Sequence, residues 1–351
     1  MITTEIIQED LAESLPIPSA EKQLEFLNNI QQLISFADTT ATYKYALLLS
    51  ITRLAIEKGK PTGDRLVLKF SDIADKFIEL YWNQAKPFHF QEQEPFILFQ
   101  SNISQAAIIR RLTEAQEKYR TISKARSDKD AWNKLNRATI QIIKNNPIWR
   151  LQYIQKESFE FLYNYDQATS TEITLLPNVM YCLRTFNLII EELCQKAWVD
   201  TVRLNKQNAH LLDSLPDLDT FLFETDRNQL TRVQPILQEI QGDRCFYCNK
   251  PIRNRSAVDH FIPWSLYQVD TAHNFVLADH SCNSQKSNFL ADLDFYQKWL
   301  ERNLEYDAFI TEEVGKIGFI ADRIRSESIA NWAYTQIQNK NGLSLWAPEI
   351  K

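Results

Sequence analysis

Four polar residues in the segment 259–286 have the side chains that phosphodiester chemistry requires. Asp259 is a hard oxygen ligand that suits Mg²⁺, and Asn283 offers a second, neutral oxygen. His260 follows Asp259 directly, and an imidazole with an ordinary pKa of about 6.5 suits a general base. Lys286 lies three residues after Asn283, on the same face of a helix, and offers a cation for a phosphate. A base, hard-metal ligands and a cation together fit phosphodiester hydrolysis.

Short β-type runs and a helical pattern must position these residues. The β-type runs are Ala257–Ile262 and Asn274–Ala278, and the helical pattern begins at about Ser281. Consecutive side chains of a strand point to opposite faces, so Asp259 and His260 reach one centre only if that strand end is distorted. The sequence therefore predicts two strands and a helix around the polar residues.

The five cysteines fall into two groups. Cys245, Cys248 and Cys282 have the spacing of metal ligands in a reducing compartment. Cys182 and Cys194 lie on one predicted helix, which separates them by about 18 Å, too far for a disulfide. We therefore expect these two cysteines to be buried as small hydrophobic side chains.

The stretch 241–291 resembles the HNH, or ββα-metal, endonuclease family. The family pattern runs CxxC, then DHxxPxS, then an Asn before a short apolar strand, then CNxxKS. The resemblance implies a compact nuclease domain that cuts DNA and leaves 5′-phosphate and 3′-hydroxyl ends. The residues that match in order are Cys245, Cys248, Asp259, His260, Pro263, Ser265, Asn274, Cys282, Asn283, Lys286 and Ser287.

The resemblance implies a role for each matched polar residue. His260 would deprotonate the attacking water, while Asp259 and Asn283 would hold one divalent metal, Mg²⁺ or Mn²⁺. Asn274 would tie the loop so that His260 is aimed. Lys286 would contact a phosphate of the substrate.

The resemblance also implies structural zinc, with one departure from the family. Where the family has four cysteines, this chain has Asp279 in place of the third. Zinc accepts carboxylate oxygen, so we expect Asp279 to complete a closed tetrahedral Zn²⁺ site with Cys245, Cys248 and Cys282. His280 is the alternative fourth ligand. In a second alternative, Asp279 caps the helix and the three thiols hold no metal.

Length and composition indicate a multidomain helical protein. The 351 residues are 44% hydrophobic and 24% charged, which excludes wholesale disorder. Only 6 residues are glycine, where average usage would give roughly 25, and such scarcity favours helices over sheets. No apolar run approaches the roughly 20 residues that span a bilayer, and no signal peptide is evident, so we expect a cytoplasmic protein without a membrane partner.

Periodicity predicts mostly helices before residue 235. Leu66–Phe70 alternates like a short strand, and helices are predicted over 105–129 and Met180–Leu204. Leu211–Leu222, with Pro216, is predicted to be a linker. The fold class that we expect is mainly α, with a zinc-stapled ββα module near the C-terminus. The expected domains are an N-terminal arm (1–20), a helical DNA-binding or partner domain (21–235), the HNH module (241–291) and a helical C-terminal extension (292–351).

Positive charge is concentrated in one segment of an acidic chain. The net charge is −6, yet residues 101–156 hold 12 Lys/Arg against 4 Asp/Glu. We expect four cations on the outer face of helix 105–129 to hold duplex DNA, because the nuclease module itself is neutral. The alternative is a solvated helix surface. The four residues are Arg110, Arg111, Lys118 and Lys124.

Other candidate residues have simpler interpretations. His89 and His210 lie outside any ligand pattern. His273 is expected to be a solvated loop residue, with contact to DNA as the alternative. Trp264, inside the motif, is expected to pack the small nuclease core. An aromatic residue near a groove also stacks on bases, so that alternative stays open for Trp264.

The combined pattern predicts a metal-dependent DNA endonuclease. Residues 41–50 and 72–82 loosely resemble the helical N-terminal region of bacterial HNH proteins of the restriction or anti-phage defence type. A homodimer or a defence-complex partner is the protein partner that this hypothesis implies. Two alternatives remain: a DNA-binding component whose HNH module is a scaffold or conditionally silent, and an RNA-cutting toxin.

Overall fold

The computed structural model describes residues 14–36, 40–88, 94–154, 157–165, 170–209, 218–223, 227–252, 255–338 and 345–348. Helices dominate these residues, which confirms the expected mainly α fold class with small strands. None of the described helices has the length and apolar content to cross a membrane. His89 and His210, and most of the expected N-terminal arm, lie outside the described residues.

The N-terminal part surrounds the helix α2, which is buried along almost its whole length. The three-stranded antiparallel sheet of the N-terminal part has the strand order β1-β5-β4. The elements are α1 (Ala20–Ser35), α2 (Tyr43–Lys58), β1 (Leu66–Lys69), α3 (Phe70–Trp82), η1 (Asn83–Ala85), α4 (Ala107–Tyr119), α5 (Ile122–Ser127), α6 (Lys129–Asn145), α7 (Pro147–Arg150), β2 (Tyr153–Ile154), β3 (Glu157–Ser158), β4 (Tyr163–Asn164), β5 (Glu172–Leu175), α8 (Val179–Thr185), α9 (Asn187–Arg203) and α11 (Leu218–Phe223).

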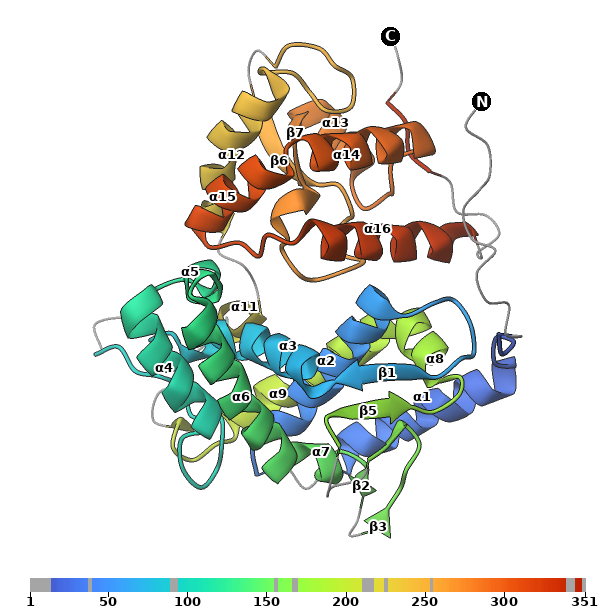
Figure 1. Cartoon of the computed structure of the whole chain (residues 1–351), viewed down its shortest axis with the longest axis vertical. Coiled ribbons are helices and arrows are strands. Elements are labelled where there is room, and N and C mark those ends of the chain that lie inside the picture. Colours follow the sequence, from blue (N-terminus) through green and yellow to red (C-terminus); the bar gives the residue numbers. More distant parts are fainter. Residues whose placement is uncertain are drawn as a thin grey trace.

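The C-terminal part consists of a β-hairpin and the helices around it. Strands β6 and β7 pair antiparallel, and α13 follows β7 directly. In Figure 1 this part lies above the N-terminal part, with α16 along the junction. The elements are α12 (Arg227–Gln241), β6 (Ser256–His260), η2 (Ala272–Asn274), β7 (Phe275–Asp279), α13 (His280–Lys286), α14 (Leu293–Glu305), α15 (Asp307–Ile317) and α16 (Arg323–Gln338).

Two predicted helices are each two helices in the structure. The helix expected over 105–129 breaks at Arg120, whose φ of 57° is left-handed, and Thr121 then caps α5. The helix expected over 180–204 breaks at Phe186, so Cys182 and Cys194 lie on α8 and α9. Both cysteines are buried free thiols, as predicted. Part of the expected linker 211–222 is also helical, because Leu218 and Leu222 anchor α11 in the core.

A buried network of ion pairs joins the two parts of the chain. Its members come from α2, α3, α5 and α16: they are Glu57, Lys76, Glu79, Arg126 and Arg325. Arg325 lies 2.9 Å from Glu57 and 2.9 Å from Glu79. Tyr267, from the loop after β6, donates to Glu57 at 2.6 Å. Loss of one partner would leave an unpaired buried charge and strongly destabilise the folded protein. The network therefore couples the packing of the two parts.

Candidate active site

The polar residues of the motif meet where β6 packs on α13. Asp259 is 7% exposed, and its Oδ2 accepts a hydrogen bond from the Tyr247 hydroxyl. The same oxygen lies 3.1 Å from Nζ of Lys286, while Oδ1 is 3.5 Å from that nitrogen. Asn283 precedes Lys286 by three residues on α13 and shares its helical face. The structure therefore brings Asp259 and Lys286 together between the strand and the helix, with Asn283 one helical turn before Lys286.

Lys286 does not reach outward to a phosphate, contrary to the sequence-based expectation. It is fully buried, and its Nζ donates to the His260 carbonyl at 2.8 Å. Burial lowers the pKa of Lys286, and the Asp259 carboxylate opposes that shift. The reason for the difference is geometric, because the α13 face that carries Lys286 packs on β6. Lys286 thus holds Asp259 and His260 in place.

The strand remains regular through its last residue. The pairing of β6 with β7 continues in register to His260, which lies opposite Phe275. Asp259 and His260 therefore leave the strand on opposite sides and have different neighbours. The expected distortion is therefore absent up to His260, which corrects that expectation. Because His260 is the last residue of β6, one substrate phosphate would contact both side chains only around the end of the strand.

His260 is held by a carboxylate that the sequence did not single out. Its Nε2 lies 2.6 Å from Oδ1 of Asp270, in the loop between β6 and β7. The side chains of His260 and Asp270 are 18% and 7% exposed. The His260 ring also packs against Phe275 and lies 6.0 Å from the Trp264 ring. The imidazole is thus fixed from several sides and keeps a partly open edge.

Asn274 fastens the loop that follows His260. Its Oδ1 accepts from the Ile262 amide at 2.8 Å, and its Nδ2 donates to the Ile262 carbonyl at 2.9 Å. This geometry fits the positioning role expected from the family. His273, expected to be solvated, is instead fully buried and hydrogen-bonded to Asp307 at 3.0 Å. Burial lowers the pKa of His273 to about 4, against the opposing effect of Asp307.

A candidate metal centre lies beside this site. The sulfur atoms of Cys245, Cys248 and Cys282 all lie within 4.8 Å of one another. Asp279 does not join them, which corrects its expected role as a zinc ligand. Its Oδ1 instead accepts from the amide and hydroxyl of Ser281, so it caps α13, and these bonds hold the pKa of Asp279 below its ordinary value. His280 is exposed and also lies outside the thiol cluster.

The local backbone explains how the first two thiols meet. The Cys245 amide donates to the Lys250 carbonyl, and the Asn249 amide donates back to Cys245. Asn249 has a left-handed φ of 57°, which closes this tight turn. The Phe246 amide binds the Leu277 carbonyl at 2.8 Å and ties the turn to β7. The two thiols of this turn, together with Cys282 of α13, could hold a thiophilic metal such as zinc.

The four expected DNA-binding cations are exposed on α4 and α5. Arg110 lines one surface hollow of about 290 Å³, and Arg111 and Lys118 line another of about 250 Å³. Lys118 also pairs with Asp128 at 3.5 Å. Among the described residues, both hollows are lined by the N-terminal part alone, so Arg110, Arg111 and Lys118 share neither hollow with His260.

Sequence reasoning missed two residues of the site. Asp270 and Tyr247 occupy no motif position, and each reaches its partner only through the folded loops. The one sequence signal for Asp270 is that it is an acidic residue in the loop after the DHxxPxS run. Such a signal is too common to identify a functional residue.

A ββα arrangement with an Asp-His pair, an Asn-bearing helix and a thiol cluster defines the class of metal-dependent nucleases. Accordingly, the family model of the HNH endonucleases matches residues 245–291. The chain thus carries an HNH endonuclease domain, which acts on nucleic acid. A second model, a domain of unknown function (DUF8808), matches residues 23–215, more than half of the chain, and the chain belongs to that family. No curated protein and no solved structure matched the chain.

Proposed function

We propose that the chain is a metal-dependent endonuclease that hydrolyses DNA, with His260 as its general base. The observation that carries the proposal is the 2.6 Å contact between His260 Nε2 and Asp270 Oδ1. When a carboxylate accepts from one ring nitrogen, the other nitrogen carries the lone pair. Nδ1 of His260 is therefore free to take the proton from an attacking water.

The donor set fits a hard divalent cation. Both Tyr247 and Lys286 contact Oδ2 of Asp259, which leaves Oδ1 with the longer 3.5 Å contact. Asp259 Oδ1 and the Asn283 amide oxygen are the hard oxygens that would hold Mg²⁺ or Mn²⁺. When bound, such an ion polarises the scissile phosphate and stabilises the leaving oxygen. The Lys286 ammonium, 3.1 Å from Oδ2, fixes the orientation of the Asp259 carboxylate beside that ion site.

Structural Zn²⁺ is proposed for the three thiols. A module of about 50 residues has a small core and commonly needs such a staple. Thiolates at this spacing suit zinc better than they suit a hard cation. The zinc would hold the turn at Cys245 against α13 through Cys282, and so fix the helix that carries Asn283.

DNA is proposed as the substrate on the strength of the motif. The loose resemblance of residues 41–50 and 72–82 to restriction and defence HNH proteins supports a role in restriction or anti-phage defence. One active site cuts one strand, so a double-strand break would require a homodimer or a second encounter. The four exposed cations on α4 and α5 remain candidates for holding a duplex outside the active site.

Plasmid nicking tests the proposal. Supercoiled DNA is incubated with the full chain and Mg²⁺, beside His260→Ala and a metal-free sample. Conversion to open circles by the wild type alone, and only with metal, is the expected result. Equal cutting by His260→Ala would disprove the assigned base. An RNA transcript of the same sequence is tested in parallel. Cleavage of the RNA alone would show that the substrate is RNA and not DNA.

A further inference from the structure

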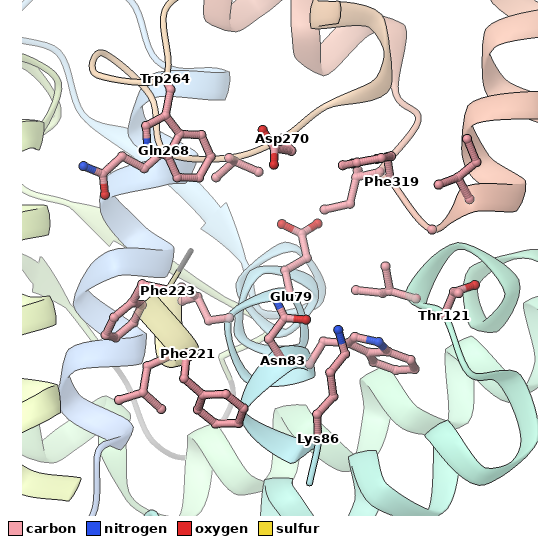
Figure 2. Close-up of a pocket in the computed structure, with 18 of the residues that line it drawn as sticks. Glu79, Asn83, Lys86, Thr121, Phe221, Phe223, Trp264, Gln268, Asp270 and Phe319 are labelled. Carbon is pink, nitrogen blue, oxygen red and sulfur yellow. The ribbon is translucent and has the colours of Figure 1, made fainter. Parts of the chain in front are cut away.

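A large cleft lies between the two parts of the chain, and two neighbours of the candidate base line it. Its volume is about 800 Å³. Asp270, which holds His260, lines this cleft, as does Trp264, whose ring lies 6.0 Å from that of His260. Figure 2 shows Trp264 and Gln268 on the side of the HNH module and Phe221 and Phe223 opposite them. Whatever occupies the cleft therefore lies next to the proposed reaction centre.

The size of the cleft limits what it can hold. Cavities of about 300–1,000 Å³ enclose single small organic molecules. A nucleotide or a short unpaired stretch of a strand has the right size.

The cleft has the two features that bind unpaired nucleic acid. Aromatic side chains line it from both parts, including Trp264, Phe223 and Phe319. Arg120, from the end of α4, and Arg232, from α12, add positive charge from opposite parts. Both arginines are exposed, and neither makes an ion pair within the described residues. A cationic groove with aromatic platforms is the usual arrangement for binding single strands.

The cleft also contains two carboxylates, Glu79 and Asp270, and its cations outweigh them. Burial disfavours the charged form of the Glu79 carboxylate. The cations Arg325, Lys76 and Arg126 nevertheless hold the pKa of Glu79 well below its ordinary value. The Glu79 side chain is only 4% exposed, and these cations neutralise it. Asp270 is already engaged by His260. Arg120, Arg232 and Lys86 all line the cleft and outnumber the remaining carboxylate, Asp270.

We propose that the cleft binds an unpaired stretch of the nucleic-acid substrate, with a base stacked on Trp264 and phosphates at Arg120 and Arg232. This inference rests on the proposed nuclease function and adds a substrate feature: DNA with a fork, flap or single-stranded tail. A free nucleotide shares this chemistry and is the alternative source.

Binding is measured first, without cleavage. A fluorescent single-stranded DNA 12-mer is titrated into full-length His260→Ala, and anisotropy is followed at several salt concentrations. Adding Trp264→Ala should weaken binding roughly tenfold, whereas Trp264→Phe, which keeps an aromatic face, should bind nearly as well. Adding Arg120→Gln and Arg232→Gln should reduce the slope of log affinity against log salt by about 1.4. Arg137→Gln, an exposed arginine on α6 outside the cleft, is the matched control.

Cleavage is compared second, on a blunt duplex and on the same duplex with a single-stranded tail. The wild type should prefer the tailed substrate, and Trp264→Ala should lose that preference. Thermal unfolding confirms that each variant is folded. If Trp264→Ala does not fold, the variant with Arg120→Gln and Arg232→Gln takes its place in the comparison, because both arginines are exposed. Unchanged oligonucleotide binding in both sets of variants would overturn the inference, even if wild type nicks plasmid. Absence of nicking with intact cleft-dependent binding would overturn the nuclease proposal alone.

A mononucleotide competition separates the two sources. Deoxyadenosine monophosphate is added to the anisotropy assay at millimolar concentration. No displacement, together with preference for the tailed duplex, supports a substrate strand. Displacement that depends on Trp264, with no preference for the tailed duplex, would make the occupant a free nucleotide and overturn the strand assignment.

Discussion

Removal of the Asp270 carboxylate tests the proposed base most directly. The hydrogen bond to His260 is 2.6 Å long, and both side chains are largely buried, at 18% and 7% exposure. A hydrogen bond with a charged partner contributes about 1.5–3 kcal/mol. If Asp270 holds the reactive tautomer, Asp270→Ala should lower kcat about ten- to 150-fold, because about 1.4 kcal/mol corresponds to a factor of ten.

Steady-state plasmid nicking gives the required kinetic constants. Because Asp270 acts through His260, kcat should fall without weaker substrate binding, and Asp270→Asn, which keeps an acceptor, should lose less. Asp294→Ala is the control, since Asp294 is an exposed carboxylate at the start of α14. A wild-type kcat in Asp270→Ala would refute the reasoning and remove His260 Nδ1 from the mechanism.

Three further predictions concern the metals and pH. Asn283→Ala should lower nicking, with partial recovery at higher Mg²⁺ or with Mn²⁺, because a metal ligand is lost; a metal titration without recovery would contradict this. Cys248→Ser should lose zinc and have a lower melting temperature, whereas Cys182→Ser should keep its zinc. Elemental analysis measures the zinc content, and a wild-type protein without zinc would contradict the zinc proposal. His273, with its pKa lowered to about 4, stays neutral when folded but takes up a proton below its ordinary 6.5 when unfolded. The free energy of unfolding should therefore fall by about 3 kcal/mol between pH 7 and pH 4, and denaturation of His273→Gln should show a smaller fall.

Hydrophobic periodicity was sufficient to predict the helical fold but not where helices break. The stripe along 105–129 continues through Arg120, and only the left-handed backbone there separates α4 from α5. The apolar pattern likewise continues through Phe186 between α8 and α9. A break without glycine or proline leaves little local signal, because tertiary packing determines it. Gly318, in contrast, has a φ of 118° and ends α15, and a glycine of this kind is a local signal that a sequence does contain.

The site was predictable where spacing along the chain places residues on one element. The β6, β7 and α13 segments and the three thiols follow from such spacing. Burial of Lys286 was not predictable, since a lysine near a phosphate site and a lysine under a strand have the same local sequence. The contact of Asp270 with His260 depends on how a ten-residue stretch of chain folds back, which periodicity does not encode.

Glu79 belongs both to the ion-pair network at the junction and to the wall of the cleft. The distance between His260 and a nucleic-acid strand bound in the cleft would therefore be set by packed side chains rather than by a flexible linker. Such an arrangement works as a molecular ruler. If the cleft holds a tail as proposed, the new ends should lie at one constant number of nucleotides from it, whatever the sequence between them.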